Sequence, residues 1–209
     1  MGLHLRDDED GPKLTVEEYL AIEREAECKS EYYRGEMFAM AGGTGNHSDL
    51  AGCVNWALRN RLAGRACKVY NSDMKVQIEP GGLNTYPDLS VVCCKPVFST
   101  PTKEALINPK LIVEVLSRST EANDRGFKFQ EYKKIASLEE YVLVSQTAPL
   151  IEFFGRRPGA AWTDYSEARG MGARLELKSL NIELSLEEIY REIELQEWKH
   201  GCTDPQIDR

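Results

Sequence analysis

The chain lacks the long apolar runs that would assign it to a membrane class, and we expect no secretory signal from its first residues. No apolar stretch approaches the roughly 20 residues that a bilayer-spanning helix needs. The first residues, MGLHLRDDEDG, are charged, whereas a signal peptide would have an apolar core there. We therefore expect a cytoplasmic protein with no membrane partner.

An excess of positive charge is also lacking. The 209 residues include 26 basic and 34 acidic side chains, which gives a net charge of −8. A module that binds nucleic acid passively and without specificity is usually basic. The composition therefore argues against such a module, although it still permits an enzyme that approaches nucleic acid through metal ions and a local basic patch.

Three short motifs are absent as well. The six cysteines form no C-x-x-C pair and Cys93 is adjacent to Cys94, so we expect reduced, scattered thiols rather than a zinc site. The glycine-rich segment 42–45 lacks the following Lys-Ser/Thr of a phosphate-binding loop. No G-x-S-x-G pattern of a hydrolase nucleophile is present.

The order of patterned segments predicts a single α/β (α+β) domain over residues 14–195. A mixed central sheet is flanked by helices, with a helix and hairpin at the N-terminal end and an antiparallel meander near the C-terminal end. We expect the tails, residues 1–13 and 196–209, to be flexible. The expected helices are at about 15–27, 46–63, 121–136 and 186–195, and the expected strands are at 31–40 (a hairpin), 68–71, 74–79, 86–94, 111–116, 141–145, 150–154, 162–166 and 174–177.

The strand at 111–116 contains one charge, Glu114, within the otherwise apolar sequence LIVEVL. Alternate side chains of a strand share a face, so Glu114 points the same way as Ile112 and Leu116. Burying a carboxylate without partners costs several kcal/mol by order of magnitude. We therefore expect Glu114 to serve a salt bridge, a metal ion or catalysis.

A second carboxylate, Asp88, begins the preceding strand in the segment YPDLSVV. Neighbouring strands lie about 4.8 Å apart, so Asp88 and Glu114 could share one divalent cation. Mg²⁺ is commonly held by one or two carboxylates together with water and substrate phosphate. The pair therefore predicts a Mg²⁺ site, in which Mn²⁺ could also bind.

Two further side chains are candidates for catalysis. Asp124, Lys128 and Tyr132 are four residues apart and form one stripe of the helix at 121–136. Lys128 could offset charge that develops on a phosphate in the transition state. His47, near the start of the second helix, could act as a general base or contact a phosphate.

The ordered array YPDLSVV, LIVEVLSRST, DRGFKFQEYKKI and SLEEYVLV resembles the Uma-two family of restriction-endonuclease-like proteins, in the PD-(D/E)xK nuclease superfamily. The resemblance covers residues 14–195. It implies a restriction-endonuclease-like fold, Mg²⁺-dependent hydrolysis of DNA phosphodiester bonds and a homodimer. By position, Asp88 and Glu114 match the two acidic residues of the superfamily motif.

One position departs from the superfamily pattern. A lysine usually stands two residues after the second acid, where this chain has Leu116, and Lys128 on the next helix matches the place to which the family moves it. Leu116 and the net charge motivate an alternative, a catalytically inactive binding or assembly module with the nuclease fold. A third possibility is a hydrolase that pairs His47 with Ser48 or Ser117.

Overall fold

The computed structural model describes residues 13–40, 42–100 and 103–197. The expected tails therefore lie outside the described residues apart from Lys13, Gln196 and Glu197. The mixed α/β class is confirmed, and the strands form two larger mixed sheets and a two-stranded one. Within the described residues no helix is long and apolar enough to cross a membrane.

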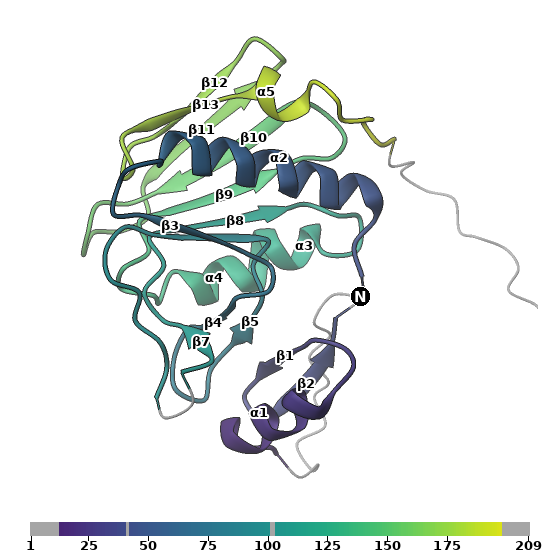
Figure 1. Ribbon diagram of the computed structural model, residues 1–209, viewed down its shortest axis with the longest axis vertical. Helices are drawn as coiled ribbons and strands as arrows, with labels where there is room; N and C mark the ends of the chain where they lie inside the picture. Colours follow the sequence, from purple (N-terminus) through teal and green to yellow (C-terminus); the bar gives the residue numbers. More distant parts are fainter. Residues whose placement is uncertain (1–12, 41, 101–102, 198–209) are drawn as a thin grey trace, which may run out of the picture.

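The larger sheet has the order β11-β10-β9-β8-β6-β3 and forms the body of the protein (Figure 1). Only β8 and β9 are parallel neighbours, and the other pairs are antiparallel. Its strands are β3 (Lys68–Asn71), β6 (Leu89–Val92), β8 (Leu111–Val115), β9 (Glu140–Val144), β10 (Leu150–Gly155) and β11 (Asp164–Arg169).

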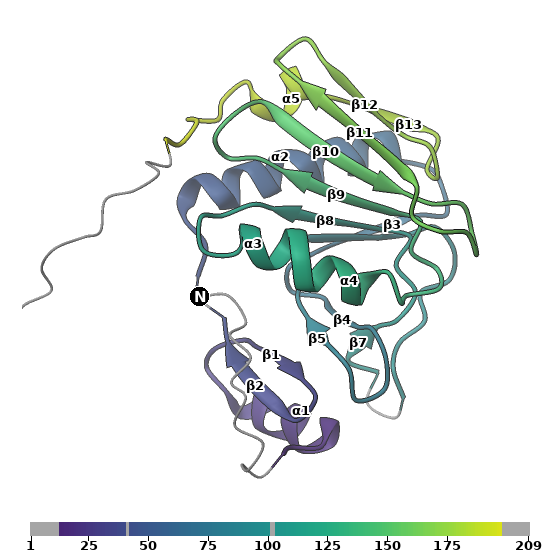
Figure 2. The same ribbon diagram turned by 180° about the vertical axis from the view of Figure 1, so that it is seen from behind.

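Helices cover both faces of this sheet. The long α2 (Gly45–Arg61) lies across one face, and the segment α3 (Glu121–Asn123), η1 (Asp124–Lys128) and α4 (Phe129–Tyr132) lies across the other, as the two opposite views show (Figures 1 and 2). Successive side chains of β8 point to opposite faces of the sheet and enter a core on each face. Val113 packs with α2, and Ile112 packs with α4. Glu114 therefore faces the α3–α4 layer.

A second sheet of order β2-β1-β5-β4-β7 lies below the body in Figure 1. Its members are β1 (Ser30–Tyr33), β2 (Glu36–Ala39), β4 (Lys75–Gln77), β5 (Asn84–Thr85) and β7 (Ala105–Leu106). The expected hairpin is β1–β2, and its turn uses Arg34 (φ 48°) and Gly35 (φ 97°), a conformation that glycine adopts without strain. The expectation of one central sheet was therefore too simple.

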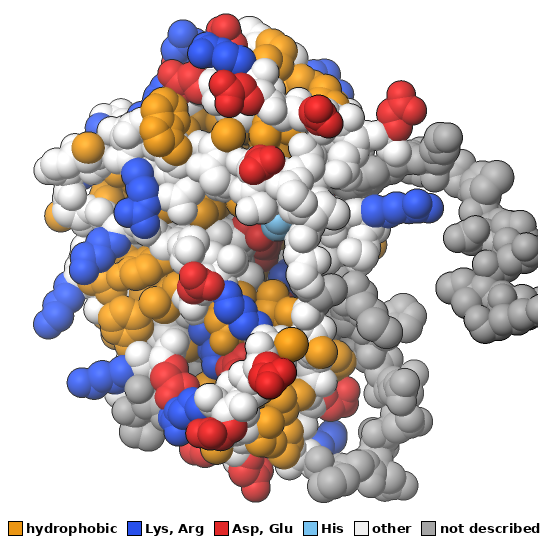
Figure 3. Space-filling model, turned by 45° about the vertical axis from the view of Figure 1, so that its right-hand side comes forward, with side chains coloured by type: hydrophobic (Ala, Val, Ile, Leu, Met, Phe, Trp, Pro, Cys, Tyr) orange, Lys and Arg blue, Asp and Glu red, His pale blue; other side chains and the backbone are white. Residues whose placement is uncertain are grey.

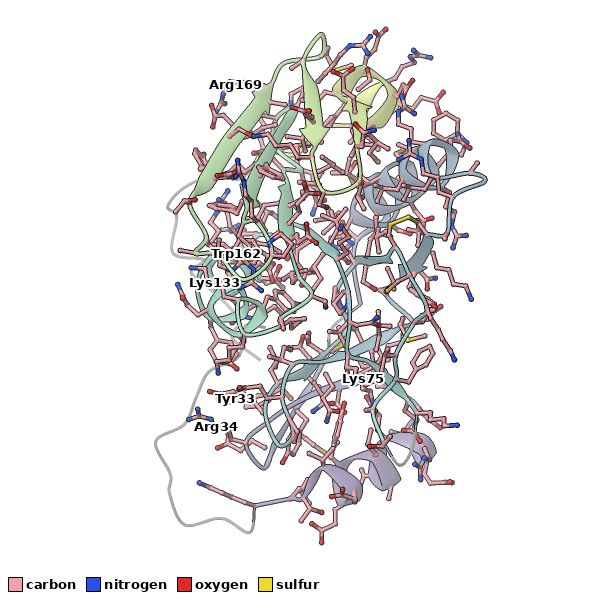
Figure 4. All side chains as sticks on the ribbon, turned by 90° about the vertical axis from the view of Figure 1, so that its left-hand side faces the viewer. Tyr33, Arg34, Lys75, Lys133, Trp162 and Arg169 are labelled. Atoms are coloured by element: carbon pink, nitrogen blue, oxygen red, sulfur yellow. A yellow bond between two sulfur atoms is a disulfide. The ribbon has the colours of Figure 1, made fainter. Side chains whose placement is uncertain are left out.

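The N-terminal helix α1 (Val16–Glu25) packs on this second sheet. Its capping box is formed, because Thr15 accepts from the Glu18 N–H while Glu18 accepts from the Thr15 N–H. Lys75 of β4, labelled in Figure 4, forms a buried ion pair with Glu23 of α1. Tyr86 also donates its hydroxyl hydrogen bond to Glu23, at 2.9 Å. The helix is thus tied to the strand that leads toward Asp88.

The C-terminal meander differs from the expectation. β10 and β11 extend the larger sheet, whereas β12 (Arg174–Leu177) pairs with β13 (Ile182–Ser185) in a separate two-stranded sheet. That ribbon and α5 (Leu186–Tyr190) close the core over α2. The final helix ends earlier than expected, at Tyr190, and β13 was not expected.

The expectation that all cysteines are reduced was wrong for one pair. Cys67 and Cys93 form a disulfide, whereas Cys28, Cys53 and Cys94 are free. The physical reason is register: Lys68 lies opposite Val92 in the antiparallel β3–β6 pair, so Cys67 and Cys93 continue the same ladder as direct neighbours. Sequence spacing alone carries no information about that pairing.

Candidate functional site

The candidate site lies in a cleft of about 820 Å³, which Glu31, His47, Asp88, Glu114, Asp124 and Lys128 line together. Figure 3 shows a hollow between the body that contains the larger sheet and the part that contains the second sheet. Acidic side chains lie beside a histidine in this hollow. All four residues that the sequence singles out, Asp88, Glu114, Lys128 and His47, therefore reach one cavity.

Strand register brings the two carboxylates together. Leu89 lies opposite Val113 in the antiparallel β6–β8 pair, so Asp88 comes next to Glu114 across the ladder. The Asp88 N–H donates to Glu114 Oε2 at 3.1 Å, and the Val115 N–H donates to Asp88 Oδ2 at 2.7 Å. These reciprocal hydrogen bonds hold both carboxylates at the end of the strand pair, on the cleft.

Lys128 reaches Glu114 from the helical layer. Its Nζ lies 3.5 Å from Glu114 Oε1, 3.6 Å from Asp124 Oδ1 and 3.1 Å from Glu31 Oε1. Residues 124–128 form a π-helical turn, a wide turn that is often found at functional sites. This turn carries both Asp124 and Lys128 into the site. Leu116, the position of the usual lysine, is instead buried in the apolar core beside α4.

Tyr132 completes the surroundings of Glu114. Its hydroxyl donates to Glu114 Oε1 at 2.7 Å, so the expected stripe of Asp124, Lys128 and Tyr132 does face the sheet. Tyr132 and Ile135 both lie in the core cluster between this helical layer and the sheet. Lys128 and Tyr132, on successive turns of the helical layer, therefore both contact the buried Glu114 carboxylate.

The electrostatics of this cluster are dominated by burial. Desolvation raises the pKa of Glu114, and the nearby Asp124 and Asp88 add to the effect, while Lys128 and Tyr132 only partly offset it. Burial also raises the pKa of Asp124. Desolvation alone would lower the pKa of Lys128, but its carboxylate neighbours raise it well above the usual value. Lys128 is thus the shared cation of Glu31, Glu114 and Asp124, and burial favours the protonated forms of Glu114 and Asp124.

His47 lies at the N-terminal turn of α2 and contacts the carboxylate of Asp88. Its Nε2 lies 3.3 Å from Asp88 Oδ2 and 3.0 Å from the Val115 carbonyl oxygen. Because both neighbours are acceptors, Nε2 carries the proton, and the hydrogen bond to Asp88 raises the pKa of His47. His47 is therefore arranged to orient Asp88, and no hydrogen bond among the described residues joins its ring to Ser48 or Ser117.

The donor set suits a hard divalent cation. Both contacts of the Asp88 carboxylate described above use Oδ2, and the carboxylate oxygens of Asp88 and Glu114 are ligands of the kind that Mg²⁺ prefers. Among the described residues, no three His, Cys, Asp or Glu side chains form a complete cage. Asp88 and Glu114 could hold such an ion only together with water or substrate oxygens, and Glu114 would release its proton on binding.

The sequence did not single out Glu31, which contacts Lys128 most closely. Glu31 is only 7% exposed. Its local pattern carries no signal, because the buried partner Lys128 lies 97 positions away in sequence and the contact depends on how the hairpin docks. Asp124, 2% exposed, was placed on the right stripe but was not singled out as part of the site.

Several charged side chains outside this cluster are engaged elsewhere. Asp73 is exposed and pairs with Lys29, and Lys75 pairs with Glu23. The basic cluster near the end of α2 is mostly occupied by protein partners. Arg59 donates to the Val69 carbonyl, Arg61 to Glu188 and Arg65 to the Leu180 carbonyl.

Comparison with known proteins agrees with this architecture. The fold matches the crystal structure of "a putative nuclease belonging to DUF820" from Anabaena variabilis with a TM-score of 0.68 at 17% identity, over 85% of this chain and 98% of that one. At that identity the match shows the fold alone.

The chain belongs to the Uma2 family, whose description is "Putative restriction endonuclease" and whose profile matches residues 16–189. Two Synechocystis proteins, both named as uncharacterised, are similar to it. The protein slr1290 is 38% identical over 182 residues, 86% of this chain and 93% of that protein. The protein sll1609 is 33% identical over 169 residues, 81% of this chain and 95% of that protein.

Proposed function

We propose that the protein is a metal-dependent endonuclease that hydrolyses DNA phosphodiester bonds. The observation that carries this proposal is the pairing of Asp88 with Glu114 at the cleft, with the Lys128 ammonium 3.5 Å from Glu114. Membership of a restriction-endonuclease family supports the substrate class. Asp88 and Glu114 hold the ion, which is Mg²⁺, with Mn²⁺ as a substitute.

Each residue has a defined part in this proposal. A bound ion supplies an activated water and polarises the scissile phosphate. Lys128 offsets negative charge as it develops on the phosphate oxygens. His47 donates from Nε2 and keeps the Asp88 carboxylate turned toward the cleft. Tyr132 orients Glu114 through the hydrogen bond to Oε1.

DNA is the proposed partner, and the protein acts as a homodimer in the cytoplasm. Two copies related by a twofold axis would present one cleft to each strand of the duplex, which is how a symmetric dimer matches a two-stranded substrate. The negative net charge of −8 makes the metal ion the main attraction for the phosphate backbone.

Incubation of the purified protein with DNA and Mg²⁺ or Mn²⁺ tests the proposal. We expect cleavage that EDTA abolishes and that Asp88→Ala lacks. Asp49→Asn is the matched control, because Asp49 is an exposed carboxylate of α2, and it should retain cleavage. Equal cleavage by the wild type and Asp88→Ala would show that this site is not responsible.

One observation favours a second function, that of a binding or assembly module without catalysis. Leu116 is 1% exposed in an apolar cluster, so the usual strand lysine is replaced by core packing. Under this alternative Lys128 is only a structural partner of Glu114. DNA binding without cleavage, together with no gain in thermal stability at millimolar Mn²⁺, would favour it.

A further inference from the structure

Three carboxylates surround the Lys128 ammonium, and the closest belongs to the N-terminal hairpin. Glu31 Oε1 lies 3.1 Å from Lys128 Nζ, against 3.5 Å for Glu114 and 3.6 Å for Asp124. The side chains of Glu31 and Lys128 are 10% and 9% exposed. Both side chains are largely buried, and Glu31 is the nearest of the three anions to this ammonium.

The hairpin is itself held in place beside Lys128. The Thr85 hydroxyl of β5 donates to Glu31 Oε1, and β5 pairs with β1 through Tyr32 and Asn84. The Tyr33 ring meets the Phe127 ring edge-on at 4.8 Å. Since Phe127 precedes Lys128 in the π-helical turn, the hairpin contacts the same turn that supplies the lysine.

The position of this ammonium matters for Glu114. A buried ammonium with Glu114 as its sole anion would be drawn fully onto that carboxylate. At the observed distances the ammonium is instead shared by the carboxylates of Glu31, Glu114 and Asp124. The other oxygen of Glu114, Oε2, accepts a hydrogen bond from the Asp88 N–H at the cleft. The Glu31 carboxylate, 3.1 Å from Nζ, is the nearest of the other anions that share the ammonium.

We propose that Glu31 is a positioning residue that holds the Lys128 ammonium between the hairpin and Glu114. The hairpin is then a part of the active site, and it keeps Glu114 available to the metal ion while Lys128 stays within reach of the phosphate. The catalytic part of this inference rests on the proposed nuclease function, whereas the anchoring of Lys128 stands on the geometry alone.

The anchoring is tested by NMR of protein labelled with ¹⁵N at lysine Nζ, without metal or DNA. Lys128→Met identifies the Lys128 signal by its disappearance. We expect slow exchange of the Lys128 ammonium protons with water in the wild type and an increase of about tenfold in Glu31→Gln, which loses a charge-assisted partner. Glu36→Gln, a partly exposed glutamate on the same hairpin, should leave the rate unchanged.

DNA cleavage by the same variants tests the catalytic part. We expect Glu31→Gln to lower the rate about tenfold, Glu31→Asp to restore part of it, and Glu36→Gln to match the wild type. Unchanged proton exchange in Glu31→Gln overturns the anchoring. If Glu31→Gln does not fold, faster exchange in Glu31→Asp supports the anchoring, and an unchanged rate in that variant overturns it. Absence of cleavage by the wild type refutes the nuclease function and leaves the NMR result to decide the role of Glu31.

Discussion

The Lys128 ammonium lies 3.5 Å from Glu114 Oε1, although Lys128 belongs to a helical layer and Glu114 to a central strand. In the usual arrangement the lysine would follow the acid on the same strand, at the position of Leu116. The π-helical turn of residues 124–128 makes the substitution possible, since it directs Lys128 onto the face of β8 that carries Glu114. Lys128 thus reaches Glu114 from η1 rather than from β8 itself.

Removal of the lysine should destabilise the fold. Lys128→Met leaves Glu31, Glu114 and Asp124 without their shared cation, and breaking a buried ion pair costs about 3–5 kcal/mol. We expect a lower midpoint of urea unfolding and the loss of DNA cleavage. Lys68→Met, which changes an exposed lysine on β3, should shift the free energy of unfolding by less than about 0.5 kcal/mol. A Lys128→Met variant as stable as Lys68→Met would contradict the ion-pair network.

Binding of Mn²⁺ should strengthen as the pH rises. Burial raises the pKa of Glu114, so the protonated form persists above the usual range of a glutamate and must release its proton to bind a metal. The apparent Kd at pH 6 is therefore expected to exceed that at pH 8, with protons released on binding. Calorimetry in buffers of different ionisation enthalpy measures both quantities. A Kd independent of pH over this range would count against Glu114 as a ligand.

The Tyr132 hydroxyl should contribute through Glu114. Tyr132→Phe removes the 2.7 Å hydrogen bond to Oε1 and leaves a buried carboxylate with one donor fewer, at a cost of about 1–3 kcal/mol. The same loss raises the pKa of Glu114 further, so Mn²⁺ binding at pH 7 should weaken. Chemical denaturation and Mn²⁺ titration check the two effects. Tyr165→Phe, at an exposed tyrosine of β11, is the control and should change neither.

A buried carboxylate outside the site should make stability depend on pH. Glu140 Oε1 accepts from the Ser179 N–H at 2.7 Å, while Oε2 has no partner among the described residues, and burial raises its pKa. Since the folded pKa exceeds the unfolded value, its contribution is fully present below about pH 4.5 and is lost as the pH rises through the folded pKa.

Replacement of the Glu140 carboxylate by an amide removes the loss of stability that is expected as the pH rises. Glu140→Gln should stabilise the protein relative to the wild type at pH 8 by about 1 kcal/mol and should give no such gain at pH 4. The free energies of unfolding at the two pH values measure the difference. Glu176→Gln, at an exposed glutamate of β12, is the control, and it should change the free energy of unfolding equally at the two pH values. An equal gain at both pH values would show that the charge of Glu140 is not the cause.

The sequence predicted the parts of the fold that local pattern determines. The strands expected at 68–71 and 174–177 have the observed bounds, and the helix expected from about residue 15 begins at Val16. The pairing of Asp88 with Glu114 could also be anticipated, because a carboxylate in an apolar strand requires a partner and the adjacent strand supplied one. Their reciprocal hydrogen bonds confirm the proximity, while the metal remains a prediction.

Features that depend on long-range docking could not be read from the sequence. The two-residue strands β5 and β7 are too short to show alternation, and they exist because β4 lies between them. The disulfide follows from the register of β3 against β6. Glu31 lies in a short hairpin, and its burial depends on how that hairpin docks against η1 and β5.

Anomalous diffraction from crystals soaked in Mn²⁺ tests the central claim most directly. We predict a single strong peak in the cleft within about 2.0–2.4 Å of carboxylate oxygens of both Asp88 and Glu114. The peak should vanish in Glu114→Gln and should survive in Glu36→Gln. A peak that contacts neither carboxylate, or no peak at millimolar Mn²⁺ in a well-folded crystal, would contradict the proposal that these two residues hold the ion.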